Sequence, residues 1–127
     1  MTTILLVDDE KLILRSLEKT LLRVGLDVLT ASDCISGSET FAQNKDEINI
    51  AVLDLNMPDF GGLPKTGAGL DLLDDLKKQK ADLPVVILTA YDEVSRAKDA
   101  VGGGASSFFV KGREQGLVEL IQKILSE

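Results

Sequence analysis

Five short apolar segments alternate along this chain with five segments whose apolar residues recur at helical spacing. The strand-like segments cover residues 3–7, 27–31, 49–58, 85–89 and 107–110, and the helical ones cover about 11–24, 33–44, 70–78, 92–101 and 117–124. Strict alternation is typical of a parallel sheet with helices on both faces, and continuous apolar strands indicate burial on both sides. We therefore predict a flavodoxin-like, doubly wound α/β fold with a five-stranded parallel sheet in the order 2-1-3-4-5 and five helices.

Polar residues that stand at the ends of four of these strands define the candidate site. Asp8 and Asp9 follow the first strand, Asp54 ends the apolar run of the third, and Thr89 and Lys111 end or follow the fourth and fifth. The predicted strand order places the first and third strands side by side, and ligands of such sheets bind at the carboxyl ends of the strands. We expect these five side chains to share one edge of the sheet.

The chemistry of this set favours a hard metal ion and a phosphoryl group. Three crowded carboxylates need a cation, and a set of oxygen ligands with neither His nor Cys selects Mg²⁺. The hydroxyl of Thr89 and the ammonium of Lys111 suit phosphoryl oxygens. Asp54 is then the nucleophile that forms an aspartyl phosphate.

Composition excludes several other classes of protein. The 127 residues predict one domain, residues 1–127, with no output domain in this chain, and no apolar run is long enough for a membrane span. The net charge of −7 argues against direct nucleic-acid binding. The chain has no histidine, which excludes Zn-His sites and Ser-His-Asp triads, and its single cysteine fits a reducing, cytoplasmic compartment.

At these positions the chain resembles the receiver domains of two-component response regulators. The matching motifs are Asp8-Asp9, Asp54-Leu55-Asn56-Met57-Pro58, Thr89-Ala90, Gly104-Ala105 and Phe108-Phe109-Val110-Lys111. They are separated in the sequence and occur in the family's order, so the resemblance covers essentially the whole chain.

The resemblance implies a phosphorelay. Asp54 would accept a phosphoryl group from a phosphohistidine on a sensor histidine kinase or a histidine phosphotransfer protein. Mg²⁺ would be held by Asp9, Asp54 and the backbone carbonyl of Asn56, with Asp8 acting mostly through water. The domain would catalyse its own phosphorylation and dephosphorylation as a signalling module, rather than act as an enzyme on a separate substrate.

The resemblance also implies an output switch. Closure of Thr89 and inward packing of Phe108 would change the surface of the fourth helix, fifth strand and fifth helix. A homodimer through this surface is compatible with the pattern, and the sequence does not specify the downstream effector or fused output domain.

The sequence departs from the family pattern at three places. Gly112 replaces the proline that usually follows the lysine, so we expect the Lys111-Gly112 bond to be trans or locally mobile. The loop 59–69 is longer than usual and adjoins the site, and Phe108 lacks the hydroxyl of the tyrosine often found there. Tyr91 and Asn56 are candidates for controlling water access and hence phosphate lifetime.

Several alternatives remain open at this point. The acids from Asp8 to Glu10 suit the N-terminus of a helix, and Asp54 and Lys111 could form a structural ion pair. A magnesium-dependent phosphatase of the haloacid-dehalogenase kind also uses an Asp nucleophile, but it needs a second Asp where this chain has Asn56. A receiver-like interaction module that works without phosphorylation is the remaining alternative.

Overall fold

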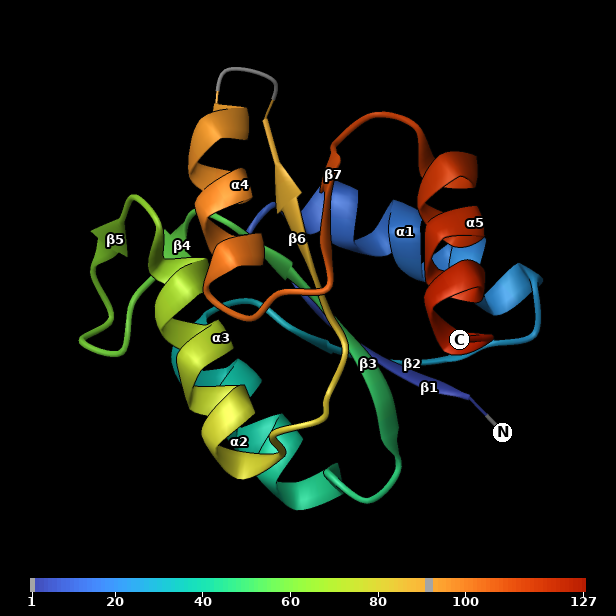
Figure 1. Cartoon of the computed structure of the whole chain (residues 1–127), viewed down its shortest axis with the longest axis horizontal. Coiled ribbons are helices and arrows are strands. Elements are labelled where there is room, and N and C mark those ends of the chain that lie inside the picture. The colour runs from blue at the N-terminus through green and yellow to red at the C-terminus, as the bar shows by residue number, and fades with distance from the viewer. Residues whose placement is uncertain (1, 91–92) are drawn as a thin grey trace.

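The structure is a computed structural model that describes residues 2–90 and 93–127, and its elements follow the predicted alternation (Figure 1). Its strands and helices are β1 Thr3–Val7, α1 Lys11–Arg23, β2 Asp27–Ala31, α2 Cys34–Asn44, β3 Ile48–Asp54, β4 Met57–Pro58, β5 Pro64–Lys65, α3 Ala68–Gln79, β6 Val85–Thr89, α4 Val94–Gly102, β7 Ser107–Val110 and α5 Glu114–Leu125. The expected helix start at Asp92, like Tyr91, lies outside the described residues.

The main sheet is parallel and has the order β2-β1-β3-β6-β7, which confirms the predicted topology. Helices α1 and α5 cover one face, and α2, α3 and α4 cover the other (Figure 1). Side chains of the central strand β3 alternate between these two layers. Ile50 and Val52 pack with α1 and α5, whereas Ala51 and Leu53 pack toward α2, α3 and α4. Burial on both faces explains why β3 is continuously apolar from Ile50 to Leu53 rather than alternating.

Local signals in the sequence mark the boundaries of the first two helices: Gly25 predicts the end of the first, and Ser32 or Asp33 can cap the start of the second. Gly25, two residues beyond α1, has φ +86°, a conformation that glycine adopts without strain. Asp33 caps α2, since its side chain accepts a hydrogen bond from the Ser36 N–H at 2.7 Å.

The helical spacing of apolar residues predicts that Ile35 of α2 and Val101 of α4 face the core, but both side chains are exposed. The buried face of α2 is formed by Cys34, Gly37 and Phe41, at spacings i, i+3 and i+7, so the neighbouring Ile35 turns outward and is 40% exposed. In α4, Ala97 is fully buried but Val101, in the last turn of the helix, is 40% exposed. Both predictions were wrong.

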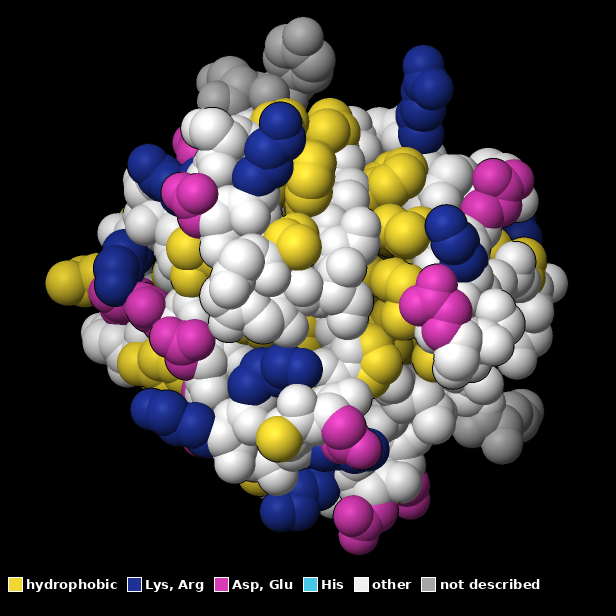
Figure 2. All heavy atoms as spheres, in the orientation of Figure 1, with side chains coloured by type: hydrophobic (Ala, Val, Ile, Leu, Met, Phe, Trp, Pro, Cys, Tyr) yellow, Lys and Arg dark blue, Asp and Glu magenta, His cyan; other side chains and the backbone are white. Residues whose placement is uncertain are grey.

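The long loop after β3 contains a small antiparallel hairpin that the sequence did not predict. Met57 pairs with Lys65, and Pro58 with Pro64. The Asp59 carboxylate accepts hydrogen bonds from two backbone N–H groups at the turn. Leu63 is 67% exposed, and Figure 2 shows hydrophobic atoms at the outer end of the hairpin beside charged side chains of both signs.

The helices of this domain do not reach membrane-spanning proportions. Over residues 2–90 and 93–127, none is both long enough and apolar enough to cross a bilayer.

Candidate functional site

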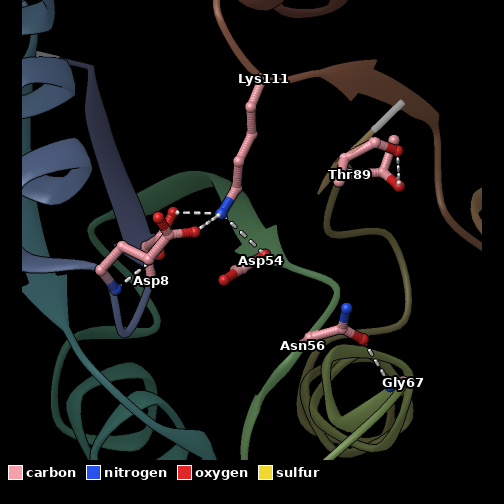
Figure 3. Close-up of polar contacts among 8 residues, drawn as sticks. Asp8, Asp54, Asn56, Gly67, Thr89 and Lys111 are labelled. Carbon is pink, nitrogen blue, oxygen red and sulfur yellow. Dashed lines mark hydrogen bonds and ion pairs between the residues drawn. The ribbon is translucent and has the colours of Figure 1, made fainter. Parts of the chain in front are cut away.

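The carboxyl edge of the sheet gathers the side chains that the sequence singled out. Asp54 is the last residue of β3 and Thr89 the last of β6, while Asp8 and Lys111 follow β1 and β7 directly. Asp8 and Thr89 are fully buried, and Asp54 is 4% exposed. Figure 3 shows Lys111 reaching down from its strand end to a point between Asp8 and Asp54.

Lys111 is the cation around which the acidic side chains are arranged. Its Nζ lies 3.1 Å from Asp54 Oδ1, 3.2 Å from Asp8 Oδ2 and 2.8 Å from Glu10 Oε1. Burial alone lowers the pKa of Lys111, but the hydrogen bond to Glu10 and the charges of Asp54 and Asp8 together raise it above its usual value. Lys111 therefore stays protonated.

Asp54 has the opposite balance. Burial, followed by the negative charge of Asp8, raises its pKa to about 7, although Lys111 opposes the shift. One ammonium group is shared among three carboxylates, so it does not offset the desolvation of each one. The site has an excess of negative charge around the buried carboxylates of Asp8 and Asp54, and an additional cation would relieve it.

The donor set fits a hard divalent cation. Carboxylate oxygens of Asp8, Glu10 and Asp54 lie within 4.8 Å of one another. Asp8 Oδ2 is buried and accepts no hydrogen bond from the described residues, even though Lys111 Nζ is nearby. A spare buried acceptor in an all-oxygen cluster is what a site for Mg²⁺ requires.

Asn56 is oriented by the start of α3. Its Oδ1 accepts a hydrogen bond from the Gly67 N–H at 2.8 Å, so the amide nitrogen points away from Gly67 (Figure 3). Gly69 donates its N–H to the Leu55 carbonyl at 2.8 Å and packs so closely that a Cβ there would lie 2.2 Å from the Asp54 carbonyl oxygen. The first turn of α3 is thus built against the backbone that carries Asp54.

Comparison with known proteins assigns this arrangement to a family. A sequence model of the response regulator receiver domain matches residues 4–124. The chain belongs to this family. It is a receiver domain of two-component systems, as the sequence motifs predicted.

Individual relatives agree with the assignment. The chain is 36% identical over 110 residues to the C4-dicarboxylate transport transcriptional regulatory protein DctD of Pseudomonas aeruginosa, covering 87% of this chain and 22% of the relative. A response regulator receiver domain from Clostridium thermocellum is similar at TM-score 0.88 and 30% identity, covering 99% of this chain and 95% of that one. TrrA of Thermotoga maritima, in complex with Mg²⁺-BeF, is similar at TM-score 0.79 and 27% identity, covering 98% of this chain and 99% of that one. The receiver domain spans about a quarter or less of the first two curated relatives it matches, 22% and 25%.

Of the acidic residues in this receiver domain, Glu10 joins the cluster and Asp9 does not. Sequence reasoning treated Glu10 only as a helix-capping acid; it is the N-cap residue of α1, but its side chain makes no cap hydrogen bond and binds Lys111 instead. Its backbone N–H donates to Asp8 Oδ1 at 2.9 Å. Asp9 is exposed and lines a hollow with Asn56 and the hairpin. The sequence does show an acidic residue, Glu10, directly after the Asp8-Asp9 pair. Its contact with Lys111 depends on the path of the chain after β1, which only the structure shows.

The two predicted switch residues lie apart from the ion-pair cluster. The Thr89 hydroxyl donates to the Ala90 carbonyl at 3.0 Å, and Figure 3 shows it directed there rather than at Asp54. Phe108 is partly buried and packs against the core beneath α2, α3 and α4.

Gly112 follows the lysine without a cis bond. Within the described residues every peptide bond is trans, and Gly112 has φ +121°, which favours glycine. The expectation of a trans Lys111-Gly112 bond is confirmed.

Proposed function

We propose that Asp54 accepts a phosphoryl group from a phosphohistidine on a sensor histidine kinase or a histidine phosphotransfer protein, in a reaction that requires Mg²⁺. The observation that carries the proposal is the position of Asp54, a buried strand-end carboxylate 3.1 Å from Lys111 and beside the Asp8 oxygen that lacks a hydrogen bond. The existence of TrrA in complex with Mg²⁺-BeF supports the same use of a related fold.

The residues divide the reaction among them. An Asp54 oxygen attacks phosphorus, the bond from phosphorus to the imidazole nitrogen breaks, and the donor histidine leaves with the electron pair of that bond. Lys111 stays charged and stabilises the phosphoryl oxygens, and Thr89 turns its hydroxyl from the Ala90 carbonyl toward them. Asp8, Asp54 and the Asn56 carbonyl, with Asp9 or Glu10, would hold Mg²⁺, which supplies charge neutralisation on the transferring group.

Hydrolysis of the aspartyl phosphate by water resets the domain. We infer that it is a signalling module that catalyses these two steps on itself. Movement of Thr89 and Phe108 would transmit the state of Asp54 to the surface formed by α4, β7 and α5, and an effector or output domain would bind that surface.

Asn56 argues against the phosphatase alternative. Its Oδ1 accepts the Gly67 N–H, and its amide has no proton that it could give to a leaving group, as a second Asp would. A receiver chemistry therefore accounts for this site better than a haloacid-dehalogenase chemistry.

The deciding experiment is intact mass after incubation with Mg²⁺ and acetyl phosphate. We expect one phosphoryl adduct on the wild type and none on Asp54→Asn or after metal chelation. If the wild type gains no adduct while Mg²⁺ still binds, the proposal is wrong and the domain is an interaction module that works without phosphorylation.

A further inference from the structure

The β4–β5 hairpin places a second lysine close to Asn56, two residues after the proposed phosphoacceptor Asp54. Lys65 pairs with Met57, the residue after Asn56, and the adjoining pair is Pro58 with Pro64. The hairpin is held at both ends. Asp59 closes its turn through backbone and side-chain hydrogen bonds, and Gly67, just past it, is bonded to Asn56.

Lys65 shares a hollow with residues of the site. The hollow has a volume of about 220 Å³, and its lining residues are Asp9, Asn56, Met57, Pro64, Lys65 and Thr66. Of these residues, Asp9 and Asn56 were predicted to take part in metal binding, whereas Pro64 and Lys65 belong to the hairpin.

Lys65 forms an exposed ion pair with Asp71, and breaking this pair costs little free energy. Its Nζ lies 2.6 Å from Asp71 Oδ2, but the two side chains are 50% and 41% exposed. Exposed ion pairs of this kind contribute little to stability, because water screens them and both side chains lose freedom. Hydrogen bonds to phosphoryl oxygens are stronger than those between neutral groups, and a phosphoryl group carries about two negative charges.

Phosphorylation creates a demand for this second cation. It replaces the single charge of the Asp54 carboxylate by about two charges on the phosphoryl group. Lys111 already serves Asp8, Glu10 and Asp54. A cation on the open side of Asn56 would offset the added charge and also obstruct water on its way to phosphorus.

We propose that Lys65 is a phosphoryl-binding residue. When Asp54 is phosphorylated, the Lys65 side chain breaks its ion pair with Asp71 and binds the phosphoryl oxygens instead, which prolongs the lifetime of the aspartyl phosphate. This inference rests on the proposed function of Asp54. It assigns the inserted hairpin the task of delivering Lys65 and gives Asp71 the role of a competitor for it.

The test is the rate at which the phosphorylated chain loses its phosphoryl group, followed by intact mass after acetyl phosphate is removed. Lys65→Gln should lose phosphate roughly two- to fivefold faster than the wild type, from the range measured for exposed charge pairs. Lys65→Arg should restore most of the lifetime. Asp71→Asn, which frees Lys65, should lengthen it, and the double variant Lys65→Gln with Asp71→Asn should behave like Lys65→Gln.

The opposite changes in phosphate lifetime expected for Lys65→Gln and Asp71→Asn distinguish phosphoryl binding by Lys65 from a purely structural role of its ion pair. Lys65→Gln and Asp71→Asn remove the same ion pair, so a purely structural pair would change the lifetime in the same direction in both. Lys78→Gln and Asp74→Asn, exposed charges further along α3, are the matched controls and should leave it unchanged.

Each failure has its own signature. A wild-type adduct with equal lifetimes in Lys65→Gln and the controls, or with shifts of the same sign in Lys65→Gln and Asp71→Asn, overturns the role of Lys65 alone. Absence of any adduct on the wild type overturns the function proposed for Asp54, and the role of Lys65 with it.

Discussion

At the scale of single residues, Asp54, the proposed phosphoacceptor, is a carboxylate whose burial has a cost in stability. Its carboxylate is buried beside Asp8, and its pKa is raised to about 7 by that burial and by the charge of Asp8. The folded protein therefore binds a proton at this position more tightly than the unfolded chain does. In the function proposed for Asp54, the same excess of negative charge favours a bound metal ion, which would in turn neutralise the incoming phosphoryl group.

This excess predicts how stability depends on pH when metal is chelated. Between about pH 4 and pH 7 the native state carries more protons on Asp54 than the unfolded state. The free energy of unfolding should then fall as pH rises, by up to about 1.4 kcal/mol per unit. Asp54→Asn removes the ionising group, so it should be more stable than the wild type at pH 8, and the gain should vanish near pH 4. Urea unfolding at several pH values measures this.

The exposed Asp46 offers a control for the same measurement. Asp46→Asn should follow the wild-type curve at every pH. A stability gain of Asp54→Asn that is the same at pH 4 and pH 8 would contradict the assigned cause, and so would a loss of stability at pH 8.

Gly69 makes a separate prediction at the residue scale. A Cβ at this position would lie 2.2 Å from the Asp54 carbonyl oxygen and 3.0 Å from the Leu55 Cα, and backbone atoms of a buried strand move little. Gly69→Ala should destabilise the domain by about 1–3 kcal/mol or more, the cost of overpacking. Gly102→Ala is the control, since nothing lies within 4 Å of its added Cβ. Equal denaturant midpoints for the two variants would be inconsistent with the close packing of α3 on β3.

At the scale of elements, what could be predicted is what short-range patterns encode. The apolar run of β3, the stripe of α1 and a cap at Ser32 or Asp33 each depend on residues a few positions apart. The run and the stripe occur as expected, and Asp33 is the residue that caps α2. The β4–β5 hairpin was not predicted because each of its strands has only two residues, too few to show a period-2 pattern. One of the two residues in each strand is a proline, which argues against a strand. The prediction that Ile35 lies on the buried face of α2 was wrong, because that face includes Gly37, which has no hydrophobic side chain to reveal it.

The residues of the candidate site also fall into those that could be predicted from the sequence and those that could not. Asp8, Asp54 and Lys111 were found because strand ends of a parallel sheet must converge, which follows from topology alone. The contact of Glu10 with Lys111 and the bond between Gly67 and Asn56 join segments whose relative path depends on tertiary packing. No local pattern announces them.

The link between α1 and α5 is an element-scale feature that can be tested. Ser16 Oγ and Thr20 Oγ1 both donate to the Glu114 carboxylate at 2.5 Å, at the first turn of α5. Glu114→Ala should destabilise the domain by about 1–3 kcal/mol, because hydrogen bonds to a charged group are lost and two hydroxyls lose an acceptor. Hydrogen exchange should show faster opening of the first turn of α5. The exposed Glu119→Ala should change neither quantity, and an unaltered α5 in Glu114→Ala would show that the link carries no stability.

At the scale of the whole molecule, the net charge of −7 and the charge of the site act together. Any salt weakens the general self-repulsion of an acidic domain, whereas a bound divalent ion also relieves the local excess at Asp8, Glu10 and Asp54. The two effects are separated by comparing Mg²⁺ with NaCl at equal ionic strength. Only the site-specific part should depend on Asp54.

Magnesium should therefore raise the thermal midpoint beyond the effect of salt. At 100 times the dissociation constant, a ligand that binds only the native state stabilises it by about 2.7 kcal/mol, which is on the order of 10 °C for a domain of this size. Asp54→Asn should keep the NaCl effect and lose most of the extra Mg²⁺ effect, because the ion loses a charged ligand and the excess charge that attracts it. If Mg²⁺ and matched NaCl raise the midpoint equally in the wild type, the cluster holds no metal, and the magnesium requirement proposed for phosphorylation of Asp54 is wrong.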